Sequence, residues 1–159
     1  MLPQATTHCN IFIESLCALF IGNLEQLQEE LEAYTDAEDQ LWLTKGEIKN
    51  SAGNLATHLL GNLNHFIGAV LAKNGYVRDR KAEFAVKNVP LQELISEIDR
   101  VKSLIQETLP QIPEADWGAP YPIEVFGKPM STAYFMQHLL SHLTYHRGQI
   151  NYHRRLINI

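Results

Sequence analysis

Three histidines near the end of the chain fall on one face of a predicted helix. Residues 130–159 contain no proline, and their apolar residues recur with helical spacing. At 100° per residue, His142, His146 and His153 lie within roughly 20° of Phe135, on the stripe that should face the core. An unpaired polar group in a core costs roughly 1–3 kcal/mol. A bound metal ion would satisfy several of these imidazoles at once.

The pair His142 and His146 has the spacing of two metal ligands on one helix. Residues four apart project from the same face, with Cβ atoms about 6 Å apart. The zinc proteases with an HExxH motif share this spacing, but Leu143 stands where their general base should be, so a protease of that kind is excluded. A third ligand would come from a facing helix. There His58 is the best candidate and His65 is the competitor.

The elements that must position these histidines are long amphipathic helices. Helical spacing of apolar residues runs through four segments, residues 10–34, 51–73, 91–109 and 130–159. No internal repeat and no set of strands of any size accompanies them. The predicted fold class is therefore all-α, a four-helix bundle. The length suits a single domain that covers residues 1–159.

Two polar connectors are expected to lie at the surface. Residues 36–50 hold the aromatic Trp42, which we expect to pack over one end of the core. Residues 76–90 are predicted to be a loop, and their charged run is expected to be solvated. The alternative is that Arg78 or Arg80 borders the mouth of a site and meets an anionic group of a ligand.

The third connector, residues 110–129, is rich in proline. Its five prolines and two glycines exclude a helix and permit at most a short extended pair at residues 123–126. Loops of this length in compact domains tend to be binding loops or lids. We therefore expect Trp117 and Tyr121 to cover a pocket.

Composition and charge narrow the classes of partner. The formal net charge is -5, and no basic run precedes the last few residues, which argues against nucleic acid. The longest apolar stretch, residues 11–22, is too short to span a bilayer. Cys9 and Cys17 would lie about 12 Å apart along a helix axis, too far for a disulfide. Reduced thiols and a cytoplasmic location are expected.

Two motifs carry a resemblance to a known family. They are LATHLLGNL at residues 55–63 and HLTYHRGQI at residues 142–150. With these motifs, the chain resembles the DinB/YfiT-like superfamily of metal-binding four-helix bundles over most of its length. In that family a divalent metal ion, often zinc or nickel, is held by one histidine of the second helix and two of the last. Carried over residue by residue, these ligands fall on His58, His142 and His146.

The resemblance also implies a function. Members with known chemistry include thiol-dependent S-transferases that use bacillithiol or mycothiol, and some related hydrolases and isomerases. The implied protein is a metal-dependent enzyme that acts on a small molecule, with a low-molecular-weight thiol as a partner. The resemblance further implies an up-down-down-up order of helices and a homodimer. The alternative is a non-catalytic metal-binding bundle that acts as a binding or stress-associated interaction protein.

Other residues in or near the two motifs have expected roles beside the three ligands. Many relatives carry a histidine where this chain has Tyr145, which points about 100° away from the neighbouring ligand and should leave the site in place. Metal-bound histidines usually need hydrogen-bond partners, and the candidates are Glu14, Asn62, His65 and Gln149. We expect Arg147 to form an ion pair with another helix, and Gly148 to allow another helix to approach closely. His138 and His153 are expected to be ordinary packing residues, and His8 should lie in a frayed end.

Overall fold

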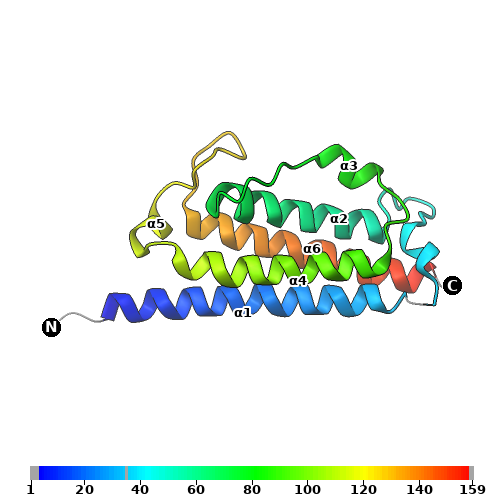
Figure 1. Ribbon diagram of the computed structural model, residues 1–159, viewed down its shortest axis with the longest axis horizontal. Coiled ribbons are helices and arrows are strands. Elements are labelled where there is room, and N and C mark those ends of the chain that lie inside the picture. The colour runs from blue at the N-terminus through cyan, green and yellow to red at the C-terminus, as the bar shows by residue number, and fades with distance from the viewer. Residues whose placement is uncertain (1–3, 35, 158–159) are drawn as a thin grey trace.

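Four long helices dominate the computed structural model, which describes residues 4–34 and 36–157 (Figure 1). They are α1 (Gln4–Glu32), α2 (Ala52–Leu63), which the π-helix η2 (Asn64–Leu71) continues, α4 (Leu91–Thr108) and α6 (Thr132–Ile157). Among the described residues there is no strand, and the prediction of an all-α fold is confirmed. The side chain of His8 and the predicted end of the last helix, residues 158–159, lie outside the described part.

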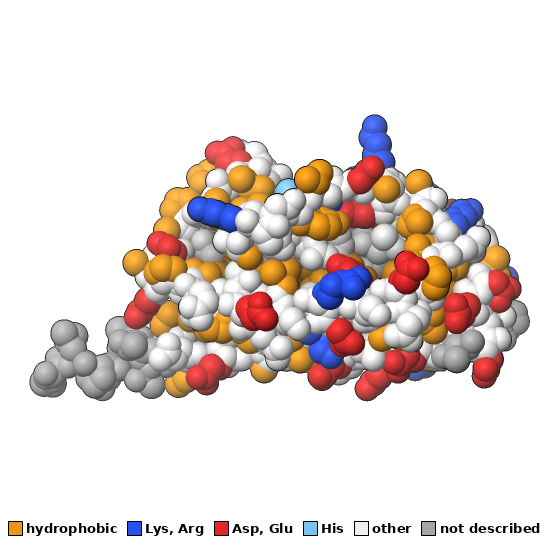
Figure 2. Space-filling view, viewed as in Figure 1, with side chains coloured by type: hydrophobic (Ala, Val, Ile, Leu, Met, Phe, Trp, Pro, Cys, Tyr) orange, Lys and Arg blue, Asp and Glu red, His pale blue; other side chains and the backbone are white. Residues whose placement is uncertain are grey.

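The long helices pack around one core. In Figure 1, α1 and α6 run from left to right, and α2 and α4 run back. The helix α1 contacts α4 and α6, and α2 contacts the same two helices. These four contacts close a ring. α1, α4 and α6 each turn one face inward and leave the opposite face to solvent, and Figure 2 shows charged side chains on the surface over α1 and α4. By contrast, α2 is buried along almost its whole length, because a further short helix packs on its outer side.

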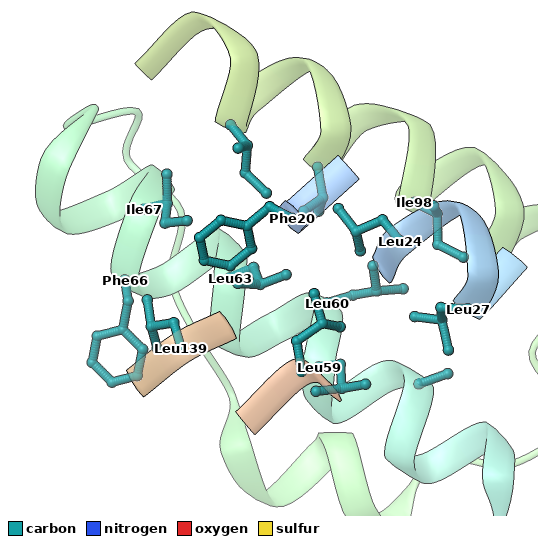
Figure 3. Packing of buried hydrophobic residues seen from close by; sticks show 14 of the residues in the cluster. Phe20, Leu24, Leu27, Leu59, Leu60, Leu63, Phe66, Ile67, Ile98 and Leu139 are labelled. Carbon is teal, nitrogen blue, oxygen red and sulfur yellow. The ribbon is translucent and has the colours of Figure 1, made fainter. Parts of the chain in front are cut away.

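Apolar side chains at three- and four-residue spacing fill the centre of this ring. Figure 3 shows three side chains of α1 that meet three of α2, with one from α4 and one from α6 beside them: Phe20, Leu24, Leu27, Leu59, Leu60, Leu63, Ile98 and Leu139. Burying an aliphatic or aromatic side chain of this size stabilises the fold by about 1.5–3 kcal/mol. This packing fixes α2 against α6, the two helices that carry the candidate ligands.

The first connector closes one end of the core. It contains the 3-10 helix η1 (Glu38–Trp42), and the indole of Trp42 is only 7% exposed. The ring lies directly on Gly53 of α2, where an added Cβ would come within 2.7 Å of three ring atoms. The expected packing of Trp42 over the end of the core is confirmed.

The second connector is more ordered than the sequence indicates. Within the predicted loop at residues 76–90 lies a short helix, α3 (Arg80–Ala85). A carboxylate oxygen of Asp79 accepts a hydrogen bond of 2.9 Å from the backbone N–H of Ala82 and caps this helix. The segment crosses α2 on the outside of the bundle (Figure 1). The loop prediction is wrong here, because one turn and a half of helix is too short to show a clear apolar period.

The proline-rich connector also contains short helices. The 3-10 helix η3 (Leu109–Gln111) ends α4 and has a proline in its first turn, where the fixed φ suits a helix start. The helix α5 (Glu114–Gly118) begins directly after its N-cap residue, Pro113. The prediction that prolines exclude any helix is therefore wrong. The extended pair expected at residues 123–126 is not found in the described chain, and an isolated bridge joins Pro120 to Ser131 instead.

Trp117 and Tyr121 belong to the core and do not cover a pocket. Both are 4% exposed. The indole of Trp117 meets the ring of Phe12 edge to face, with centroids 5.6 Å apart. The hydroxyl of Tyr121 donates a hydrogen bond of 2.6 Å to the carbonyl of Phe66. These two side chains fasten the third connector to α1 and η2.

The helices also agree with the predictions of free cysteines and of no membrane-spanning segment. Cys9 and Cys17 are free and half-buried in α1, as their spacing predicts. None of the helices in the described residues is both long enough and apolar enough to cross a membrane.

Candidate metal centre

The side chains of His58, His142 and His146 meet between α2 and α6. One nitrogen from each ring can be chosen so that the three atoms all lie within 4.8 Å of one another. The Nε2 atoms of His58 and His142 are 3.2 Å apart. Two nitrogens bound to a tetrahedral zinc ion at 2.0–2.1 Å would lie about 3.3 Å apart. The separation of these two nitrogens therefore suits a shared metal ion, and a nitrogen of His146 lies close enough to complete the site.

Packing of α2 against α6 brings the three rings together. His142 and His146 are one turn apart on α6, whose first turn is capped by the Ser131 hydroxyl, which accepts from the backbone N–H of Tyr134 at 3.2 Å. On α2, His58 is buried, with 5% of its surface exposed. His65 lies further along the same helix and is not part of the cluster. Of the two candidates for a third ligand, the structure brings His58 to the pair.

Glu83 contacts the far side of the His58 ring, a role that the sequence does not reveal. The residue is 4% exposed, and its Oε2 lies 2.8 Å from Nδ1 of His58. A carboxylate only accepts hydrogen bonds, so this contact places the imidazole proton on Nδ1 and leaves the lone pair on Nε2. Nε2 is the nitrogen that faces His142. The tautomer required of a metal ligand is thereby set.

Arg78 holds the same carboxylate. Its Nε donates to Oε1 of Glu83 at 2.6 Å, and a terminal nitrogen donates to Oε2 at 2.9 Å. The guanidinium also lies 5.7 Å from the ring centroid of Phe66 and 3.3 Å from Nδ1 of His58, a longer contact than that of the carboxylate. The prediction that the charged run is solvated is wrong for Arg78 and Glu83. It is right for Arg80, which is exposed. Arg78 does border the site, as the alternative proposed, but its partner is Glu83.

Gln149 orients His146 in a similar way. The amide oxygen of Gln149 lies 2.6 Å from Nδ1 of His146 and accepts its proton, so that Nε2 is free to face the other rings. The amide nitrogen of Gln149 donates to the Tyr145 hydroxyl at 3.3 Å. Tyr145 is exposed and lies outside the cluster, as the 100° rotation predicts. Gln149 is the one candidate orienting residue that bonds to a ligand in the described structure.

The other three candidates make no such bond. Glu14 is exposed on α1 and lines a surface hollow with Cys17 and Gln106, so its assignment is wrong. The side-chain oxygen of Asn62 and Nδ1 of His65 are buried without a hydrogen-bond partner among the described residues. Neither contacts a ligand nitrogen within hydrogen-bond distance.

The electrostatics of the cluster favour neutral imidazoles. Burial, together with the neighbouring rings of His146 and His58, lowers the pKa of His142 to about 4. Burial also lowers the pKa of His58, although the hydrogen bond to Glu83 acts in the opposite direction. In addition, Nδ1 of His142 is buried without a partner. Neutral histidines with free lone pairs are what a divalent metal ion requires, so the residues fit such an ion.

The remaining histidines of α6 are packing residues, as expected. The ring of His138 stacks on Phe135 with centroids 5.9 Å apart. His153 is 3% exposed and bonds to the Tyr34 hydroxyl and the Leu43 carbonyl. Both predictions are confirmed.

Two expectations for the end of the last motif are wrong. The ion pair from α6 to α1 is made by Arg154, whose Nε lies 2.9 Å from a carboxylate oxygen of Glu30. For Arg147, no ion pair is found in the part of the chain that the structure describes. Gly148 is exposed, and an added Cβ would meet nothing within 4 Å, so it does not mark a close helix contact.

Fold and site together define an all-helical protein with a three-histidine cluster that could hold a metal ion. The sequence matches the family model of the DinB superfamily over residues 16–150, a range that contains all three histidines. The chain belongs to the DinB superfamily. A search among curated proteins finds no match to this sequence.

Proposed function

We propose that this protein binds one divalent metal ion, Zn²⁺ or Ni²⁺, through His58, His142 and His146. The observation that carries the proposal is the convergence of three imidazoles from two helices, two of them with the Nδ1 proton held by a partner. Membership of the DinB superfamily supports it. Three protein ligands leave coordination positions open, as in catalytic rather than structural zinc sites.

The proposed activity is that of a metal-dependent enzyme acting on a small molecule, either a thiol-dependent S-transferase or a hydrolase. A bound ion of this kind supplies Lewis acidity to a substrate oxygen, a bound water or a thiolate. The two cysteines of the chain lie in α1, outside the cluster, and burial raises the pKa of the Cys17 thiol. A reactive thiol would therefore come from a low-molecular-weight cosubstrate.

The setting of this activity is also proposed. We infer a single cytoplasmic domain, an up-down-down-up bundle and a homodimer. The helix directions visible in Figure 1 support the order of the bundle. Free cysteines support a reducing compartment.

A non-catalytic metal-binding bundle is the second candidate. It is favoured by the location of two cavities, of about 1000 and 750 Å³, whose lining residues include none of the three histidines. In that case the metal ion would stabilise the fold and the protein would act as an interaction partner.

The first test is metal analysis of protein purified without a nickel column. The wild type and His138→Ala are expected to carry near one divalent ion per chain, and His142→Ala is expected to carry almost none. His138 is a matched control because it lies one turn away on the same helix face without joining the cluster. Equal metal content in both variants would show that the ligand assignment is wrong.

The second test separates enzyme from binder. Low-molecular-weight thiols are screened against electrophilic acceptors, with the metal-loaded protein and with the chelated protein. Turnover that requires the metal supports the transferase. No turnover, together with a large loss of thermal stability on chelation, supports the structural alternative.

A further inference from the structure

We propose that residues 76–86, here called the strap, position the metal ligand His58 through Glu83, and that docking of the strap and binding of metal reinforce each other. This inference rests on the proposed metal site and names the part of the chain that controls it. In Figure 1 the strap is the green segment that crosses above α2 and includes α3. None of its residues is a candidate ligand.

The strap is attached to the helix that carries His58 by its backbone as well as by its charges. The side-chain amide of Asn54, on the first turn of α2, donates to the carbonyls of Glu83 and Val86 at 3.1 and 2.7 Å. The amide oxygen of Asn54 accepts in turn from the Ser51 hydroxyl at 2.8 Å. Asn54 is 5% exposed. Because both ends of the Glu83–His58 contact are tied to α2, the carboxylate meets the imidazole at a fixed distance.

The carboxylate of Glu83 packs directly against Gly61 of α2, where the missing side chain leaves room for it. An added Cβ on Gly61 would lie 2.3 Å from Oε1 of Glu83 and 2.8 Å from its carboxyl carbon. A glycine within a helix costs about 1 kcal/mol relative to alanine, so it needs a packing reason. Here the reason is the carboxylate. Any side chain at position 61 must push the carboxylate away from His58.

Charge explains why this carboxylate can stay buried. Glu83 and Arg78 have side chains that are 5% and 11% exposed, and they form a pair of opposite charges with two hydrogen bonds. The Arg78–Glu83 pair thus brings no net charge to the three imidazoles. The carboxylate of Glu83 provides one hydrogen-bond acceptor at Nδ1 of His58, which fixes both the position of the imidazole proton and the orientation of the ring.

Coupling between strap and metal follows by linkage. A metal ion at Nε2 makes the Nδ1–H group a stronger donor, so the bond to Glu83 strengthens when metal binds. Linkage is reciprocal, so a docked strap must raise the metal affinity by the factor by which metal favours docking. Partners of this kind are worth roughly 10- to 100-fold in metal affinity. Hydrogen exchange in α3 should accordingly slow when metal is added.

The experiment compares two ways of disturbing the carboxylate. Glu83→Gln removes its charge, and Gly61→Ala displaces it while keeping both charges of the pair. Glu124→Gln, at an exposed loop position, and Gly22→Ala, at a helix position where an added Cβ meets nothing within 4 Å, are the matched controls. Metal affinity is measured by competition with a chromophoric chelator. Heteronuclear NMR of the metal-free proteins reports which imidazole nitrogen of His58 carries the proton.

The expected result is a fall in metal affinity of roughly 10- to 100-fold for Glu83→Gln and Gly61→Ala, with the controls unchanged. In the metal-free wild type, His58 should be protonated at Nδ1, and in Gly61→Ala this preference should weaken. Metal should slow exchange in α3 of the wild type and not in Gly61→Ala. A merely structural role for Glu83 would lower the unfolding temperature without moving the tautomer.

The measurements distinguish a wrong role for the strap from a wrong assignment of the metal site. If the wild type binds metal and both variants bind it equally well, the strap has no positioning role and the metal site stands. If the wild type binds no metal, the metal site is wrong, and the tautomer of His58 in the metal-free proteins decides on the strap. A proton on Nε2 in the metal-free wild type overturns the inference in either case.

Discussion

The hydroxyl of Tyr34 donates a hydrogen bond of 2.7 Å to Nδ1 of His153 and joins the end of α1 to the end of α6. The direction of this bond follows from the other ring nitrogen. Nε2 of His153 lies 2.8 Å from the carbonyl of Leu43, which only accepts, so Nε2 carries the proton and Nδ1 must accept. One neutral histidine therefore links two long helices and the first connector at the end of the bundle opposite to α5.

Loss of the Tyr34 hydroxyl should destabilise the protein. Tyr34→Phe leaves Nδ1 of His153 buried without a donor, which costs about 1–3 kcal/mol. Tyr134→Phe is the control, because that side chain is 58% exposed and should change stability by less than about 0.5 kcal/mol. The free energy of unfolding is measured in urea. Equal effects of the two substitutions would contradict the buried bond.

The same histidine should make stability depend on pH. Burial lowers the pKa of His153 below its usual value near 6.5. Between the lowered pKa and 6.5 the unfolded chain binds more protons than the folded one, so the free energy of unfolding falls as the pH falls through this window. Its contribution is fully present above about pH 6.5.

His153→Gln tests this dependence, because glutamine keeps a donor and an acceptor but does not titrate. Urea unfolding of the chelated wild type and variant is compared at about pH 7.5 and pH 5.5. The pKa values of His58, His65 and His142 are lowered as well, so the variant should lose less stability than the wild type but still lose some. An equal loss in both proteins would show that His153 does not contribute.

Close packing of Trp42 on Gly53 predicts a site-specific cost for a single methyl group. In Gly53→Ala the new Cβ would lie 2.7 Å from the indole, and because a ring packed in the core cannot simply swing away, overpacking should cost about 1–3 kcal/mol. Gly148→Ala, on an exposed helix position with no atom within 4 Å, should instead stabilise by up to about 1 kcal/mol. Unfolding followed by tryptophan fluorescence measures both.

The candidate ligands were predictable from the sequence because their signal is local. His142 and His146 stand one helical turn apart on an apolar stripe, a pattern set by the period of the helix alone. His58 required the added evidence of its motif, since spacing on α2 left His65 as a competitor. The helices were predictable for the same reason, because each carries several turns of apolar spacing.

Glu83 was not predictable from the sequence because its burial depends on how the strap docks on α2. A run of charged residues is normally solvated, and nothing near residue 83 indicates that Arg78 will neutralise it or that Gly61 will make room. The available signal was Gly61 itself, an otherwise costly glycine inside an apolar helix. The short helix that carries Glu83 was missed because its capping residue, Asp79, lies inside the same charged run.

Gln149 offers a last test of how the ligands are oriented. In Gln149→Leu the Nδ1 proton of His146 loses its acceptor, and the ring becomes free to rotate away from His58 and His142. Metal affinity should fall by roughly 10- to 100-fold with little change in the stability of the metal-free protein, because Gln149 is exposed. Gln137→Leu is the control, since Gln137 is exposed on the same helix and bonds only to a backbone carbonyl. If both variants bind metal as tightly as the wild type, the hydrogen bond to Gln149 does not orient His146, and the strap at His58 would be the one orienting contact left among the described residues.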